Sequence, residues 1–102
     1  MHLIQIFLQI RDNNKRPFPK EHYARIRKEL AKKFGGLTAY TRAPAEGFWK
    51  DEQNDASHDD IVIFEVMADE LEGTWWQDYK RQLKTTFAQD DIIIRVQKIM
   101  LL

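Results

Sequence analysis

The feature that most constrains the fold is the order in which two periodicities follow one another along the chain. Residues 3–10, LIQIFLQI, alternate with the period of two that is typical of a β-strand. Residues 19–34 then place apolar side chains three or four positions apart, the spacing of one helical face. The same order returns in the second half of the chain. The sequence therefore predicts six elements in the order β-α-β-β-α-β.

The first helix has recognisable signals at both ends. Pro19 suits the first helical turn, where the backbone N–H that proline lacks has no helical partner. The pair Gly35–Gly36 predicts the end of the helix, because glycine adopts the left-handed conformation most easily. The apolar stripe between these signals consists of Tyr23, Ile26, Leu30 and Phe34.

The second helix carries an aromatic stripe. Its members are Trp75, Trp76, Tyr79, Leu83 and Phe87. Such a stripe is usually part of a core, so we expect one or both tryptophans to pack on the sheet; the alternative is that one of them caps a ligand cleft. Asp69 followed by Glu72 resembles a capping box, whereas Gly73 favours a later start.

Three further strands are predicted. They are residues 37–43 (LTAYTRA), which Pro44 interrupts and 48–50 (FWK) resume, residues 61–67 (IVIFEVM) and residues 92–99 (IIIRVQKI). Residues 51–60 are polar and acidic, and we predict a mobile hairpin loop there. His58, Asp59 and Asp60 are adjacent in this segment, but a solvated loop explains them better than a metal site does.

Two strand–helix–strand units joined by a hairpin predict a ferredoxin-like α+β sandwich, with both helices on one face of a four-stranded antiparallel sheet. Right-handed crossovers place the first and third strands in the centre of the sheet and the other two at its edges. The length of 102 residues suits a single domain that spans residues 1–102.

The glycine pair Gly35–Gly36 before the second strand, the run TAYTRAP and the GFW at 47–49 carry a resemblance. They look like the dimeric α+β-barrel superfamily, and within it one of the uncharacterised small bacterial groups. This resemblance implies a homodimer that pairs sheet against sheet. The superfamily includes cofactor-free monooxygenases and small isomerases, but none of their catalytic signatures maps onto this chain residue by residue.

The strand side chains divide into two sets. The apolar set, which we expect beneath the helices, is Ile4, Ile6, Leu8, Ile10, Leu37, Ala39, Thr41, Val62, Phe64, Val66, Ile92, Ile94 and Val96. The mixed set, on the reverse face, is Gln5, Phe7, Gln9, Thr38, Tyr40, Arg42, Ile61, Ile63, Glu65, Met67, Ile93, Arg95 and Gln97. The reverse face is too apolar for bare solvent and too polar for a dry core. A wet cavity or a subunit interface would satisfy both demands.

Glu65, on the third strand, is the central residue of this mixed face. A carboxylate there needs a cationic or hydrogen-bonding partner, for which Arg42 and Arg95 are candidates. Their pairing could set the register of a dimer, or these groups could hold a polar ligand; general acid–base catalysis by Glu65 is a third alternative. Trp49 could cover the mouth of a cavity or pack on a partner. The predicted ligand-binding residues are Tyr40, Arg42, Trp49, Glu65 and Arg95.

The sequence argues against a disulfide-based scaffold, a dinucleotide-binding or P-loop protein, an α/β-hydrolase and a membrane-spanning helix. The chain has no cysteine, no GxGxxG, Walker or GxSxG motif, and no apolar run of the roughly 20 residues that a membrane helix needs. Its formal net charge is zero, although residues 11–33 hold nine Lys or Arg against three Asp or Glu, and residues 46–72 hold one Lys against ten Asp or Glu. We expect a cytoplasmic protein without a cofactor or metal, and without a nucleic-acid or membrane partner.

Two functions follow as hypotheses. The first is a protein that binds a small, partly aromatic or anionic molecule in a cleft on the sheet face, either as a binding protein or as a cofactor-independent monooxygenase or isomerase. The second is a non-enzymatic dimeric interaction or regulatory module without a ligand site.

Overall fold

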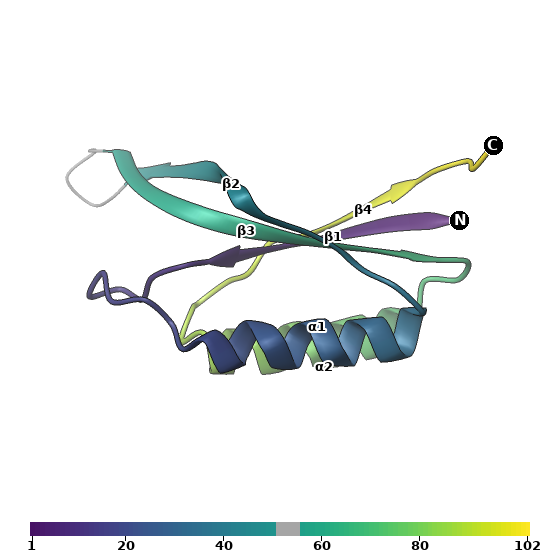
Figure 1. Cartoon of the computed structure of the whole chain (residues 1–102), viewed down its shortest axis with the longest axis horizontal. Helices are drawn as coiled ribbons and strands as arrows, with labels where there is room; N and C mark the ends of the chain where they lie inside the picture. The colour runs from purple at the N-terminus through teal and green to yellow at the C-terminus, as the bar shows by residue number, and fades with distance from the viewer. Residues whose placement is uncertain (51–55) are drawn as a thin grey trace.

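The computed structural model describes the backbone of residues 1–50 and 56–102, and the side chains of residues 1–40 and 61–102. The elements are β1 (His2–Gln9), α1 (Lys20–Phe34), β2 (Thr38–Lys50), β3 (Ala56–Ala68), α2 (Gly73–Thr86) and β4 (Ile94–Lys98). The strands form one antiparallel sheet in the order β2-β3-β1-β4. Both helices lie on one face of this twisted sheet (Figure 1). The predicted ferredoxin-like fold, with the first and third strands in the centre, is confirmed.

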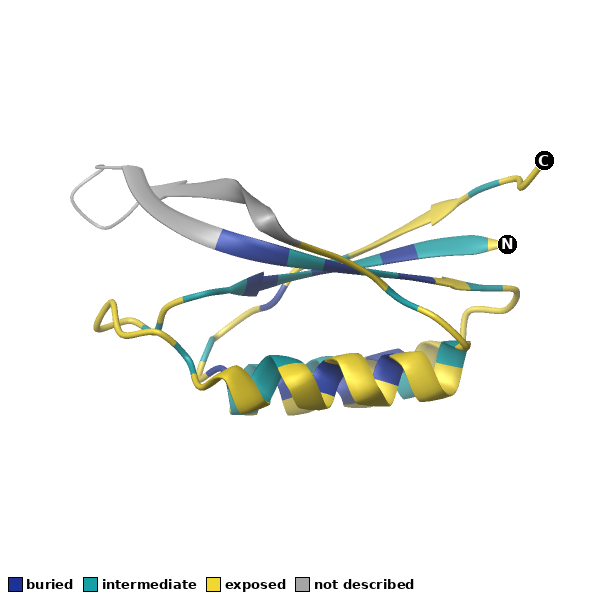
Figure 2. Ribbon diagram, in the orientation of Figure 1, coloured by how far each residue is buried: buried dark blue, intermediate teal, exposed yellow. Residues whose placement is uncertain are grey.

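The core lies between the two central strands and the inward sides of the helices. Figure 2 shows this as buried residues along β1, β3 and the sheet side of the helices. Ile4, Ile6 and Phe64 are completely inaccessible to solvent. Burying a side chain of this size contributes about 1.5–3 kcal/mol, so these strands hold the sheet on the helices. The predicted partition of the side chains is confirmed for β1 and β3.

The partition is less complete at the two edges of the sheet. Ala39 on β2 and Val96 on β4 belong to the apolar set, yet both are exposed. Both residues lie on edge strands, which have a neighbouring strand on one side only and so receive less cover from the sheet. Thr41 lies outside the residues whose side chains are described. The expectation that the whole apolar set is buried is therefore wrong at Ala39 and Val96.

The first helix begins and ends where the sequence predicts. It starts at Lys20, directly after Pro19, and it stops at Phe34. Gly35 adopts the left-handed conformation with φ of 77°, and its N–H donates a hydrogen bond of 2.9 Å to the carbonyl oxygen of Ala31. A Cβ at Gly35 would meet no heavy atom within 4 Å. The backbone conformation, and not a lack of space, is therefore what requires glycine here.

The second helix begins at Gly73, and the predicted capping box is absent. Glu72 is the N-cap residue, but it forms no side-chain cap hydrogen bond. Its carboxylate instead forms an ion pair with Lys33, at 2.8 Å between Oε2 and Nζ, and this pair links the end of α1 to the start of α2. Trp76 is buried in the core, as expected for at least one of the two tryptophans. Trp75 is half-buried and its ring stacks on that of Tyr79, with 4.7 Å between the centroids.

Two strand boundaries differ from prediction by more than one residue. β3 already begins at Ala56, so residues 56–60 pair with β2 and do not form a loop; His58 pairs with Phe48 and Asp60 with Glu46. Backbone hydrogen bonds between hairpin strands do not require apolar side chains, which is why the polar sequence is misleading here. Residues 51–55 lie outside the described residues. The other difference is that β4 begins at Ile94, two residues later than predicted.

The interruption at Pro44 is confirmed. The register of β2 and β3 shifts between the pair Tyr40–Ile63 and the pair Ala45–Ile61. Over this interval β2 advances by five residues while β3 advances by two. Proline lacks the N–H that regular pairing needs, so a bulge of the edge strand accommodates it.

Gly35→Ala is expected to lower the free energy of unfolding by about 1 kcal/mol, because a side chain at this residue disfavours the left-handed conformation. Gly36→Ala is the matched control, since Gly36 has no positive φ and also meets no atom within 4 Å. Urea unfolding followed by tryptophan fluorescence measures both variants. Equal stability of the two variants would contradict this account of the helix stop.

Candidate functional site

The candidate site lies on the open face of the sheet, opposite the helices. The strand register arranges its side chains in rows that cross the sheet. The middle row consists of Thr38, Glu65, Gln5 and Arg95. The next row consists of Tyr40, Ile63, Phe7 and Ile93, whose carbonyl oxygen accepts the Phe7 N–H at 3.0 Å. The row on the other side consists of Met67, Leu3 and Gln97. A polar row is thus flanked by two mainly apolar rows.

Glu65 is half-buried and is held by two neutral donors. Nε2 of Gln5 donates to Oε1 of Glu65 at 2.7 Å, and the Tyr40 hydroxyl donates to Oε2 at 3.2 Å. These donors fix the orientation of the carboxylate and use two of its roughly four acceptor positions. The negative charge of Glu65, together with this hydrogen bond, raises the pKa of Tyr40 above its usual value. The site is therefore a preorganised hydrogen-bond acceptor on a largely apolar surface.

Arg95, one of the two candidate partners of Glu65, does not contact it within one chain. Gln5 occupies the strand between them and is the register partner of both. The guanidinium of Arg95 lies over the Phe7 ring, with 4.5 Å from Cζ to the ring centroid. This cation–π contact keeps Arg95 on the open face, where it is exposed to solvent.

Of the five predicted site residues, Tyr40 and Glu65 are in direct contact and Arg95 lies in the same row as Glu65. Arg42 and Trp49 both belong to β2, but their side chains lie outside the described part of the structure. Gln5 lies on the face predicted from the alternation of β1, but its role as the partner of Glu65 was not predicted. Only the register, which aligns Gln5 with Glu65, reveals this pairing.

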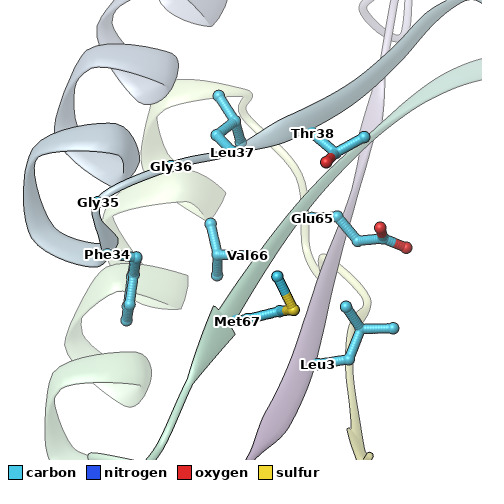
Figure 3. Close-up of a pocket in the computed structure, with 9 residues that line it drawn as sticks. All are labelled: Leu3, Phe34, Gly35, Gly36, Leu37, Thr38, Glu65, Val66 and Met67. Carbon is cyan, nitrogen blue, oxygen red and sulfur yellow. The ribbon is translucent and has the colours of Figure 1, made fainter. Parts of the chain in front are cut away.

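A hollow of ≈ 250 Å³ lies beside Glu65, where the chain passes from α1 into β2 (Figure 3). Its lining residues are Leu3, Phe34, Gly35, Gly36, Leu37, Thr38, Glu65, Val66 and Met67. It is smaller than the 300–1,000 Å³ of usual small-molecule sites. The lining is mainly apolar, with the Glu65 carboxylate at one side (Figure 3). The hollow can thus hold part of a ligand or one or two side chains, but not a larger molecule by itself.

Within the described part of the chain, no three His, Asp or Glu side chains are grouped so that they could hold a metal ion. Among the described helices, none is long and apolar enough to cross a membrane.

Comparison with known proteins identifies the fold. No protein-family model matches the chain, and no curated protein matches its sequence. Among solved structures, a phage SAM lyase in complex with S-methyl-5'-thioadenosine superposes with a TM-score of 0.62 at 15% identity, covering 95% of this chain and 80% of that chain. The phage SAM lyase in its apo state gives 0.60 at 13% identity, covering 94% and 78%. At these identities the likeness shows a shared fold and nothing more.

Glu65→Gln is expected to lower the pKa of Tyr40 toward its usual value of 10.0, because the charge that opposes tyrosinate formation is removed. Tyr23 serves as the internal control: burial raises its pKa to about 12, and its hydroxyl donates to the carbonyl oxygen of Gln9. An NMR titration of ¹³C-labelled tyrosine from pH 8 upward measures both groups. If the pKa of Tyr40 stays unchanged in the variant, the contact with Glu65 is not present in solution.

Proposed function

We propose that the open sheet face binds a small molecule at Glu65 and the adjacent hollow, between two copies of the chain. The observation that carries this proposal is a half-buried carboxylate, oriented by Gln5 and Tyr40, in an otherwise apolar surface. The two donors offset only part of the cost of taking a carboxylate out of water, and preorganised polar groups in apolar surroundings are typical of ligand sites.

The side chains of the site limit the chemistry of the ligand. An ionised carboxylate only accepts hydrogen bonds, so the ligand would offer an O–H or N–H to Glu65. The exposed ring of Tyr40 offers an aromatic surface against which a flat ring can pack. Arg95, over Phe7, offers a cation to an anionic group. These features favour a small, partly aromatic molecule that carries hydroxyl or amine donors, with or without an acid group.

The structural neighbours suggest the first molecules to test. S-methyl-5'-thioadenosine, named in the complex of the phage SAM lyase, combines an aromatic base with hydroxyl donors. SAM carries the same nucleoside. If the site also catalyses a reaction, as a cofactor-independent isomerase or monooxygenase would, Glu65 is the described side chain that is placed to act as the base.

Self-association is part of this proposal. The open face exposes Tyr40, Met67 and Ile93 to between 45% and 48% of their surfaces, and such an apolar patch favours an interaction partner. A second copy laid over the face would enclose the hollow and enlarge it toward the volume of an ordinary ligand site. A homodimer with its sheets face to face is therefore the proposed state.

The non-enzymatic dimeric module remains the second candidate, and the small volume of the hollow favours it. In that case contacts between the two copies would fill the open face and leave no ligand site. A stable dimer that takes up none of the probes described next would support this candidate over the first.

Isothermal titration calorimetry with S-methyl-5'-thioadenosine, SAM and a panel of aromatic acids and quinones tests the ligand proposal. For a probe that binds, Glu65→Gln is expected to weaken affinity at least about tenfold, because a hydrogen bond to a charged group contributes roughly 1.5–3 kcal/mol. Glu29→Gln, on α1 and therefore on the far side of the sheet from the open face, is the matched control and should bind like the unmodified chain. Absence of binding across the panel, or equal affinity of Glu65→Gln, would refute the proposal.

A further inference from the structure

Glu65 and Arg95 lie at equal distances on either side of Gln5. Gln5 is the register partner of Glu65 on β3 and of Arg95 on β4. Neighbouring strands are about 4.8 Å apart, so the two residues are about 10 Å apart across the sheet. Within one chain each contacts something else: Glu65 contacts Gln5 and Tyr40, and Arg95 contacts Phe7. Two opposite charges thus flank one strand without meeting.

A two-fold axis that runs over Gln5, parallel to β1, brings these charges together when two copies lie face to face. The axis exchanges the flanking strands, so β3 of one copy lies opposite β4 of the other. Glu65 of each copy then faces Arg95 of the second copy, as in any isologous interface where one contact occurs twice. We propose that a second copy closes the open face in this register, and that each site is completed by Arg95 of the second copy.

This inference rests on the self-association proposed above and adds two things to it. It gives the register of the dimer, and it names the residue that the second copy contributes to the site at Glu65. A ligand bound there would then meet both a carboxylate and a guanidinium, one from each copy.

The apolar rows agree with the same axis. Phe7 and Leu3, both on β1, come to lie opposite their own equivalents in the second copy. Ile63 on β3 comes to lie opposite Ile93, which aligns with Phe7 on the β4 side. Ile93 is 45% exposed in the single chain, so it has surface to bury. The register that pairs Glu65 with Arg95 of the second copy therefore also places the apolar rows of the two copies against each other.

The alternative orientation is unfavourable. A two-fold axis perpendicular to the strands would lay β3 over β3 and place Glu65 opposite Glu65 of the second copy. It would also place Arg95 opposite Arg95, so both contacts would join like charges, which opposes association. The charges on the open face thus discriminate between the two ways of stacking the sheets.

Sheet twist does not disrupt the pairing. Packed sheets lie about 10 Å apart and are rotated by about 30° relative to each other. A residue one strand from the axis is displaced by only about 2.5 Å by this rotation. The long side chains of Glu65 and Arg95 can accommodate such a shift, whereas contacts at the sheet edges would diverge more.

Two charge reversals test the register by sedimentation velocity. In Glu65→Arg both contacts between the copies join two cations, and in Arg95→Glu both join two anions. Each variant alone is expected to raise the dimer dissociation constant at least about tenfold. Mixed in equal amounts, the two variants are expected to form a mixed dimer with a dissociation constant within about threefold of that of the unmodified chain, because every contact then joins opposite charges.

Arg81→Glu is the matched control for net charge. It makes the same change as Arg95→Glu, from a chain of net charge zero, but on the outer side of α2, where the side chain is 74% exposed. Mixed with Glu65→Arg, it supplies the same net attraction without the proposed contact, and no strong mixed dimer is expected. Circular dichroism verifies that each variant folds, and Arg95→Glu, with its exposed side chain, provides the test even if Glu65→Arg does not fold.

Three results would overturn the register: an unmodified chain that is monomeric, an Arg95→Glu variant that self-associates normally, or a mixed dimer that forms equally well with Arg81→Glu. The ligand proposal fails separately. A dimer that shows the charge-swap pattern but binds no probe would support the proposed register and refute the proposed ligand site. A dimer that binds S-methyl-5'-thioadenosine without the charge-swap pattern refutes the register alone.

Discussion

The alternation of side chains along β1 and β3 is the constraint on which the rest of the structure depends. The side chains of Ile4, Ile6 and Leu8 on β1 and of Val62, Phe64 and Val66 on β3 are buried against the helices, and those of Ile4, Ile6 and Phe64 are wholly inaccessible. Because the period of a strand is two, this burial forces Gln5, Phe7 and Glu65 onto the opposite face. A change of register by one residue would expose the core and bury the carboxylate, so the composition of the open face follows from the demands of the core.

The periodicity of apolar residues predicts best those elements whose position depends on burying one face. The stripe of α1, its stop at Gly35 and the central place of β1 and β3 could all be predicted, because each depends on periodicity or on one backbone conformation. Two features could not be predicted in the same way. The start of β3 at Ala56 depends on backbone pairing, which a run of polar residues does not indicate. Glu72 forms an ion pair with Lys33 of α1 and does not cap its own helix.

The candidate site was predictable as a face but not as a set of contacts. Alternation placed Tyr40, Glu65 and Arg95 together, while the partners of Glu65 depend on which residues the register aligns. Gln5 lies between the two charges, so Glu65 and Arg95 do not pair within one chain. That separation is also what makes the face complementary to a second copy of itself, since opposite charges then lie symmetrically about one strand.

The central claim, that a second copy covers the mixed face, is tested most directly by the oxidation of methionine. Met67 lies on this face and is 48% exposed in the single chain, whereas Met100 is 86% exposed beyond β4. Brief treatment with hydrogen peroxide, followed by mass spectrometry of peptides, gives both rates in one sample. A covered face predicts that Met67 reacts at least about tenfold more slowly than Met100, because a buried thioether is shielded from the oxidant. Rates within about twofold of each other, as the exposures in a single chain imply, would contradict the account.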